Sequence, residues 1–213
     1  MRLHPSETID HLTPEDALQY LRDGNARFLS NLRLNRNLLQ QVNETREGQW
    51  PFAAILSCID SRTSAELIFD QGLGDMFVVR TAGHVLDSAV LGSIEYAVTI
   101  LNVPLIVVLG HDSCGAVRAA LDVVDGGEIP PGYIRDVVER VTSSVLLGRR
   151  DGLKTVDEFE ARHVLETGTQ LLARSAAIKE GVENGSLAVV GVTYHLADGR
   201  ASLRGHIGDI GEV

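Results

Sequence analysis

The sequence is poor in the residue types that mark specialised classes of protein. Its 213 residues include two cysteines, and only 5% are aromatic. Two cysteines are too few for a disulfide-stabilised scaffold, and in a reducing cytosol they are expected to be buried thiols, reactive thiols or metal ligands. Because aromatic side chains are scarce, aliphatic residues must form the core of this 44% hydrophobic chain. The composition predicts one globular domain, with room for a helical arm.

Long apolar runs and basic clusters are also missing. No run approaches the roughly 20 apolar residues of a membrane-spanning helix, and the polar start MRLHPSETID has no apolar segment of a signal peptide. The formal charge is −10, and Arg149-Arg150 is too short a basic run to neutralise a phosphate backbone. We therefore expect a cytoplasmic protein that binds neither nucleic acid nor membrane.

Two amphipathic segments begin the chain. Residues 13–30 read as a helix, with Thr13 as its cap and Pro14 at the first helical position. A second helical stretch follows at about 36–47. Their narrow apolar stripes leave two interpretations open: packing on the surface of the same domain, or an arm that lies on a partner subunit.

The rest of the chain alternates short apolar runs with helical patterns. Apolar runs at 52–57, 76–79 and 105–109 precede helical patterns at about 63–69, 87–101 and 114–124. Two further helices are predicted at 133–148 and 156–182. The last two strands, 187–192 and 201–204, are joined by a hairpin turn at Asp198-Gly199. Such alternation is typical of βαβ units around a buried parallel sheet. We therefore predict an α/β fold, with a central sheet of about four parallel strands plus an antiparallel edge strand, flanked by helices.

Chemically active residues follow two of the predicted strands. Cys58, Asp60 and Arg62 follow the first run, and His111 and Cys114 follow the run at 105–109. Because ligands bind beyond the carboxyl ends of parallel strands, both groups are expected at one rim of the sheet. Two thiolates, an imidazole and a carboxylate form a complete tetrahedral set for zinc.

Each of these residues also has a simpler interpretation. Cys58 alone is more often a small buried side chain, Asp60 alone a helix cap, and His111 alone a core histidine with its hydrogen bonds satisfied. Their joint placement at strand ends favours a metal site. A cysteine phosphatase loop is excluded because Ser64 stands where its arginine is required, and the chain has neither a P-loop lysine nor a Cys-x-x-Cys redox pair.

The pattern Cys58-x-Asp60-Ser61-Arg62 with His111-x-x-Cys114 resembles the β-class carbonic anhydrases over nearly the whole chain. The resemblance implies a lyase that hydrates carbon dioxide reversibly to bicarbonate by zinc-hydroxide attack, with one Zn²⁺ per chain on Cys58, His111 and Cys114. It implies that Asp60 and Arg62 form a catalytic dyad, and that Asp60 becomes a fourth zinc ligand if the site closes. The expected division is a helical arm, 1–48, on a partner subunit, and a zinc-binding catalytic domain, 49–213.

The family's open-site members line a small apolar pocket with a glutamine, a phenylalanine and a tyrosine, partly from the neighbouring subunit. Gln49, Phe77 and Tyr96 stand at the matching spacings, although the two aromatic residues alone read as ordinary core residues. The resemblance thus implies a homo-oligomer, either a dimer or a dimer of dimers.

Some closed-site relatives hold bicarbonate with a tryptophan, an arginine and a tyrosine. Arg80 and, approximately, Tyr194 match two of these, but Ile55 occupies the tryptophan position. The open-site branch is therefore expected. Two alternatives stay open: a carbonyl sulfide or carbon disulfide hydrolase on the same scaffold, and a zinc-stabilised sensor module without turnover.

Overall fold

The computed structural model describes residues 12–212, so the first eleven residues of the expected arm, which include the polar start of the chain, lie outside the described residues. Five strands form one sheet in the order β2-β1-β3-β4-β5, with the first four parallel and β5 antiparallel to β4. The strands are β1 (Ala53–Cys58), β2 (Met76–Thr81), β3 (Leu105–His111), β4 (Ala188–Tyr194) and β5 (Ala201–Ile207). This confirms the predicted α/β class and sheet composition.

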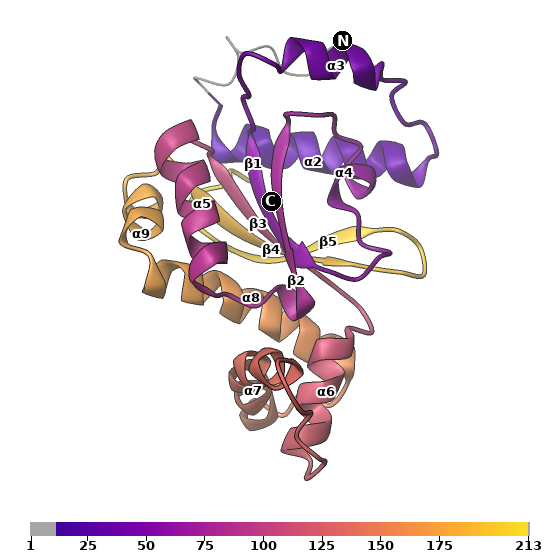
Figure 1. Ribbon diagram of the computed structural model, residues 1–213, viewed down its shortest axis with the longest axis vertical. Helices are drawn as coiled ribbons and strands as arrows, with labels where there is room; N and C mark the ends of the chain where they lie inside the picture. Colours follow the sequence, from indigo (N-terminus) through magenta and orange to yellow (C-terminus); the bar gives the residue numbers. More distant parts are fainter. Residues whose placement is uncertain (1–11, 213) are drawn as a thin grey trace.

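Helices cover both faces of the sheet, which explains why its central strands are continuously apolar. Alternate β1 residues such as Ile55 pack toward α2 (Pro14–Leu29) and α4 (Ala65–Ile68). The others, such as Leu56, pack toward α5 (Ser88–Leu101), α8 (Val156–Arg174) and α9 (Ala176–Glu183). Figure 1 shows the sheet between these two sets of helices. Within residues 12–212 no helix combines the length and apolarity needed to cross a membrane.

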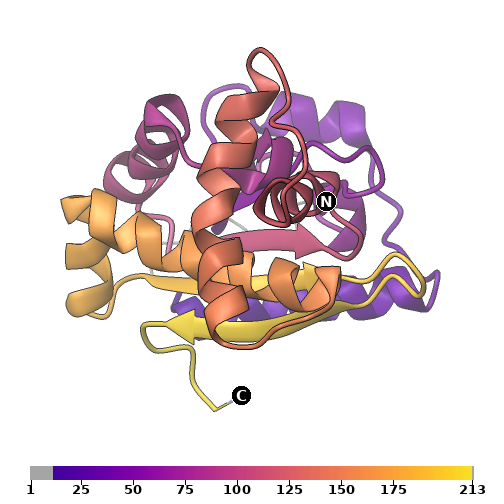
Figure 2. The same cartoon turned by 90° about the horizontal axis from the view of Figure 1, so that it is seen from below.

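A third apolar cluster closes the carboxyl end of the parallel strands. It joins α6 (Gly115–Val124), α7 (Ile134–Arg150) and the start of α8, and it contains both cysteines. Figure 2, seen from below Figure 1, shows α6 and α7 in front of the strands. The rim that carries the candidate site is therefore roofed by apolar side chains rather than left open on all sides.

The two N-terminal helices differ in their packing. Thr13 caps α2 as predicted, and Leu18 and Leu21 are buried in the same core cluster as β1 and β3. By contrast α3 (Leu38–Glu44) leaves Leu38 and Leu39 exposed. The stripe of α2 thus packs on its own domain, whereas the apolar side chains of α3 are left exposed by the rest of residues 12–212.

One predicted helix is wrong in its extent. The pattern at 156–182 is two helices, α8 and α9, separated at Ser175, whose backbone is extended and whose hydroxyl caps α9 through the N–H of Ile178. The break has neither proline nor glycine to mark it. The helix predicted at 63–69 is also shorter, since α4 spans Ala65–Ile68.

Candidate metal centre

Adjacent strands bring the three predicted metal ligands together. Cys58 is the last residue of β1, His111 is the last residue of β3, and these strands are paired. Cys114 comes directly before α6, after a tight turn in which Ser113 has a φ of 58°. The two sulfurs and a ring nitrogen of His111 all lie within 4.8 Å of one another, and all three residues are buried.

The hydrogen bonds of His111 turn one nitrogen toward the sulfurs. Its Nδ1 lies 2.8 Å from the carbonyl oxygen of Asp112, so Nδ1 carries the proton and donates it. Its Nε2 is then a bare acceptor, buried and without a hydrogen-bond partner among the described residues. This outer hydrogen bond is the arrangement that fixes the tautomer of a metal-binding histidine.

The two sulfurs are chemically suited to a dication. A hydrogen bond from Cys114 lowers the pKa of Cys58, which favours the thiolate form of Cys58, and the same contact raises the pKa of Cys114. A dication removes the second proton too, because a coordinating thiol is deprotonated by the metal. One unpaired imidazole nitrogen and two sulfurs at this spacing fit a zinc ion and leave a fourth position open.

Asp60 and Arg62 lie beside this cluster. Asp60 is not the helix cap that its sequence position also suggested, because α4 begins after Ser64. Its carboxylate instead accepts from Nε and Nη2 of Arg62 at 2.9 and 2.7 Å, and these hydrogen bonds hold the pKa of Asp60 well below its usual range. Oδ2 of Asp60 lies 3.9 Å from Nε2 of His111, so an ionised carboxylate borders the metal position.

Comparison with known proteins decides the family. A family model described as carbonic anhydrase matches residues 53–201. The chain belongs to the carbonic anhydrase family. A carbonic anhydrase of Mycolicibacterium smegmatis is 61% identical over 94% of this chain and 98% of its own length, and carbonic anhydrase 2 of Mycobacterium tuberculosis is 65% identical over 93% and 97%.

Solved structures place the fold in the β class of this enzyme family. The β-carbonic anhydrase CcaA matches with a TM-score of 0.68 at 24% identity, over 90% of this chain and 99% of that one. A tetrameric β-carbonic anhydrase from Sordaria macrospora matches with a TM-score of 0.69, also at 24% identity, over 89% and 97%. The resemblance seen in the sequence to β-class carbonic anhydrases is therefore confirmed.

The three residues matched to the carbonic anhydrase substrate pocket do not join the metal centre of their own chain. Phe77 pairs with Ala54, four positions before Cys58 on β1, which is about 13 Å along the strand. The rings of Phe77 and Tyr96 contact each other edge to face, with their centroids 6.5 Å apart, along an open groove between β2 and α5. Gln49 is exposed and borders a separate pocket beside Trp50.

Arg80 has its own partners. Its Nε and Nη2 donate to the backbone carbonyl oxygens of Cys58 and Asp60 at 2.9 and 2.6 Å, while Ile55 is buried inside the sheet. The arginine thus fixes the loop that carries Cys58 and Asp60. Tyr194 lies beside His111 across the β3–β4 pair.

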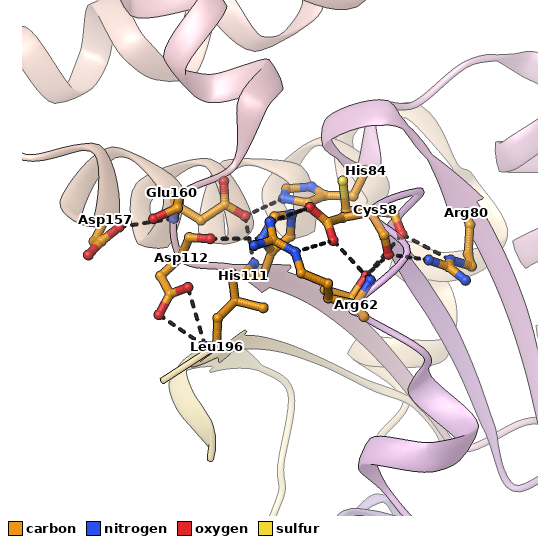
Figure 3. A network of polar contacts seen from close by, with 12 residues as sticks. Cys58, Arg62, Arg80, His84, His111, Asp112, Asp157, Glu160 and Leu196 are labelled. Atoms are coloured by element: carbon orange, nitrogen blue, oxygen red, sulfur yellow. Dashed lines mark hydrogen bonds and ion pairs between the residues drawn. The ribbon is translucent and has the colours of Figure 1, made fainter. Parts of the chain in front are cut away.

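Sequence reasoning missed the residues that hold the second ligand loop. Asp112 accepts from the backbone N–H of Leu196, and Asp157 of α8 accepts from the backbone N–H of Ser113 at 3.2 Å. Glu160, one turn further along α8, accepts from the N–H of His111 (Figure 3). The sequence signal that could have identified Asp157 and Glu160 is their spacing of three residues, which places two polar side chains on one face of a helix that the predicted fold packs against the sheet.

Proposed function

We propose that this protein catalyses the reversible hydration of carbon dioxide to bicarbonate and a proton, using one zinc ion held by Cys58, His111 and Cys114. The observation that carries the proposal is that a ring nitrogen of His111 and two buried sulfurs lie within 4.8 Å of one another, while Nε2 of His111 has no hydrogen-bond partner among the described residues. The names of the 61–65% identical relatives support the same activity. Held by these residues, a zinc ion would supply a Lewis acid that makes hydroxide available near neutral pH.

Asp60 and Arg62 are proposed as the catalytic dyad. The lowered pKa of Asp60 keeps its carboxylate ionised at neutral pH, as an acceptor that can take the hydrogen bond of the attacking hydroxide and aim its lone pair at carbon dioxide. The two-pronged contact with Arg62 keeps that carboxylate turned toward the guanidinium. The side chain of Arg62 is 56% exposed, so this contact can open, and the released carboxylate of Asp60 would be available as a fourth ligand to a bound zinc ion.

The substrate pocket is proposed to be completed by a second copy of the chain. Phe77, Tyr96 and Gln49 lie away from the metal position of their own chain, and Tyr96 is half exposed beside the edge strand β2. The uncovered leucines of α3 support an arm, 1–48, whose second helix lies on a partner. A homodimer or a dimer of dimers would complete the substrate pocket and cover the leucines of α3. The Sordaria enzymes are described as tetrameric. Ile55 in place of tryptophan supports the open-site branch.

The test is stopped-flow hydration of carbon dioxide by the purified protein, before and after removal of metal with a chelator. We expect hydration well above the buffer rate, loss of that rate with the metal, and its return when zinc is added. A zinc-loaded protein that only matches buffer would overturn the proposal and favour a sensor module. Turnover of carbonyl sulfide or carbon disulfide in place of carbon dioxide would identify the other hydrolase.

A further inference from the structure

A buried polar cluster lies behind the metal centre and has no part in the proposed reaction. Its members are at most 2% exposed and come from three elements: Glu160, His163 and Thr167 of α8, Ser144 of α7, and His84 of the short 3₁₀ helix η1 (Ala82–His84). Burial of so many polar groups is costly unless their hydrogen bonds are made. Their contacts therefore show what the cluster holds in place.

One oxygen of Glu160 makes the contact with the ligand strand. Its Oε1 accepts from the backbone N–H of His111 at 3.2 Å and from Nε2 of His84 at 3.1 Å (Figure 3). The approach requires a glycine at position 110, since a Cβ there would lie 2.1 Å from that oxygen. Gly110 and Glu160 are thus fitted to each other directly beside the metal-ligating histidine.

Through His84, the contacts of Glu160 extend to Gly83 and from there to Cys58 at the end of β1. Its ring stacks on that of His163 at 4.4 Å, and Nε2 of His163 donates to the carbonyl oxygen of Gly83 at 2.9 Å. The backbone of Gly83 in turn hydrogen-bonds to Cys58. His84 has a φ of 42°, an unfavourable backbone for a residue other than glycine, so its surroundings must hold it there.

One polar atom of this cluster destabilises the folded protein, which would not be expected if the cluster served stability alone. The second oxygen of Glu160, Oε2, is buried and has no hydrogen-bond partner within the described part of the chain. A buried carboxylate oxygen without a partner is destabilising, and an apolar side chain of similar shape would avoid the penalty. Such a group is explained if its other oxygen does something that an apolar side chain cannot.

We infer that Glu160 is a positioning residue of the metal centre: its Oε1 fixes the backbone of His111 directly and, through His84, the Gly83–His84 turn that contacts Cys58. Two of the three ligands would then be set by one carboxylate. The inference rests on the proposed zinc site, but it is tested by metal binding and by a spectrum, without turnover.

The experiment compares Glu160→Leu with Leu171→Ala. Both change a buried residue of α8, but Leu171 belongs to the apolar cluster between the sheet and α5, α8 and α9, whereas Cys58 and Cys114 belong to a different cluster. For each protein we would measure the zinc dissociation constant by chelator competition, the absorption spectrum of the Co²⁺ form, and the melting temperature. We expect Glu160→Leu to weaken zinc binding about 10–100-fold and to alter the Co²⁺ bands, as loss of an outer hydrogen-bond partner does.

Leu171→Ala separates positioning from stability. It should lower the melting temperature yet leave zinc affinity within about twofold and the Co²⁺ spectrum unchanged. Glu160→Gln should recover most of the affinity, because its amide oxygen can still accept from the N–H of His111. If Glu160→Leu behaves like Leu171→Ala, Glu160 is structural only and the inference is wrong.

Should Glu160→Leu not fold, His84→Asn decides the question, because asparagine tolerates a positive φ. Loss of the link to Glu160 should weaken zinc binding and change the Co²⁺ spectrum. Unchanged values would overturn the inference. Failure of the proposed function looks different: the parent protein itself would bind no zinc, or would bind it without hydrating carbon dioxide.

Discussion

Arg62 holds both carboxylate oxygens of Asp60, two residues before it in the chain, at 2.7 and 2.9 Å. The backbone N–H of Arg62 adds a third hydrogen bond to Oδ1 at 3.0 Å. The carboxylate is therefore ionised and aimed, yet its partner is largely exposed to solvent. This combination favours a contact that can be released without unfolding any part of the core.

Arg62→Ala should release Asp60 while leaving the zinc ligands untouched. The freed carboxylate borders a dication and has no cation left to turn it away, so metal ligation becomes its strongest interaction. Activity at neutral pH should fall about 100-fold or more, although zinc content stays at one per chain. The check is a pH–rate profile together with metal analysis. Parental turnover at neutral pH would show that the contact is not a gate.

Asp60→Ala is the matched variant, because it removes the same ion pair from the other side. It cannot close the site, so we expect low activity from loss of the orienting acceptor. That activity should depend less on pH than in the parent, since no carboxylate remains to switch between Arg62 and the metal. A variant that still loses activity as abruptly with pH as the parent would assign the switching to another group.

Each cysteine ligand should be indispensable for metal binding. Cys58→Ser or Cys114→Ser replaces an ionisable thiol by a hydroxyl, which is not deprotonated by the metal as readily. Zinc content and carbon dioxide hydration should fall together, by more than the roughly 10–100-fold expected for an outer-shell partner. Metal analysis and stopped-flow rates on the same samples are the measurement. A metal-free Cys114→Ser protein with full activity would exclude this site.

The sequence predicted the strands, the parallel character of the sheet and the proximity of Cys58, His111 and Cys114 because these depend on local patterns. Apolar runs such as 105–109 are recognisable alone, and strand ends carry their chemistry to a common rim. The contact of Glu160 with His111 was not predictable in the same way. It joins residues 49 apart in the chain and depends on how α8 crosses β3. The break at Ser175 was missed since a hydroxyl cap, not proline or glycine, makes it.

The second helix of the arm should contribute to assembly without contributing to the core. A truncation of residues 1–47 would also remove α2, whose Leu18 and Leu21 are buried in the domain, so it would confuse loss of assembly with unfolding. Changing Leu38 and Leu39 of α3 to glutamine avoids this, because both are more than half exposed within the chain. We expect a smaller oligomer by light scattering and lower activity at an unchanged melting temperature. An unchanged oligomer would show that α3 lies on no partner.

Arg80 should not support a bicarbonate pocket. Its guanidinium is held by the carbonyl oxygens of Cys58 and Asp60, and Ile55 offers no indole to cover an anion beside it. Bicarbonate is therefore expected to inhibit hyperbolically, as a product. Arg80→Ala should lower activity by loosening the Cys58–Asp60 loop, with no change in the form of inhibition. Sigmoidal inhibition in the parent that disappears in Arg80→Ala would contradict this.

Asp70 should contribute strongly to the stability of the fold. It is buried at a φ of 44° and accepts from Nε of Arg27 and Nη1 of Arg36, both at 2.6 Å, so it ties the end of α2 and the segment before α3 to α4. Loss of one partner from such a buried group costs about 3–5 kcal/mol. Asp70→Asn should therefore lower the melting temperature by roughly 6–20 °C in a domain of this size.

The pH dependence of this effect has a definite sign. Burial alone would raise the pKa of Asp70, but the hydrogen bonds from Arg27 and Arg36 outweigh it and hold the value below the ordinary 3.8. Because the pKa of Asp70 is lower in the folded state than in the unfolded state, its stabilisation is complete above about pH 3.8 and is lost as the pH falls through the pKa of the folded state. The difference in melting temperature between parent and Asp70→Asn should thus be constant near neutral pH and shrink below about pH 4. Glu139→Gln is the control, since its ion pair with Arg135 is exposed on both sides and its loss should change the melting temperature little. Equal effects of the two variants would show that the Asp70 cluster does not hold the arm to the domain.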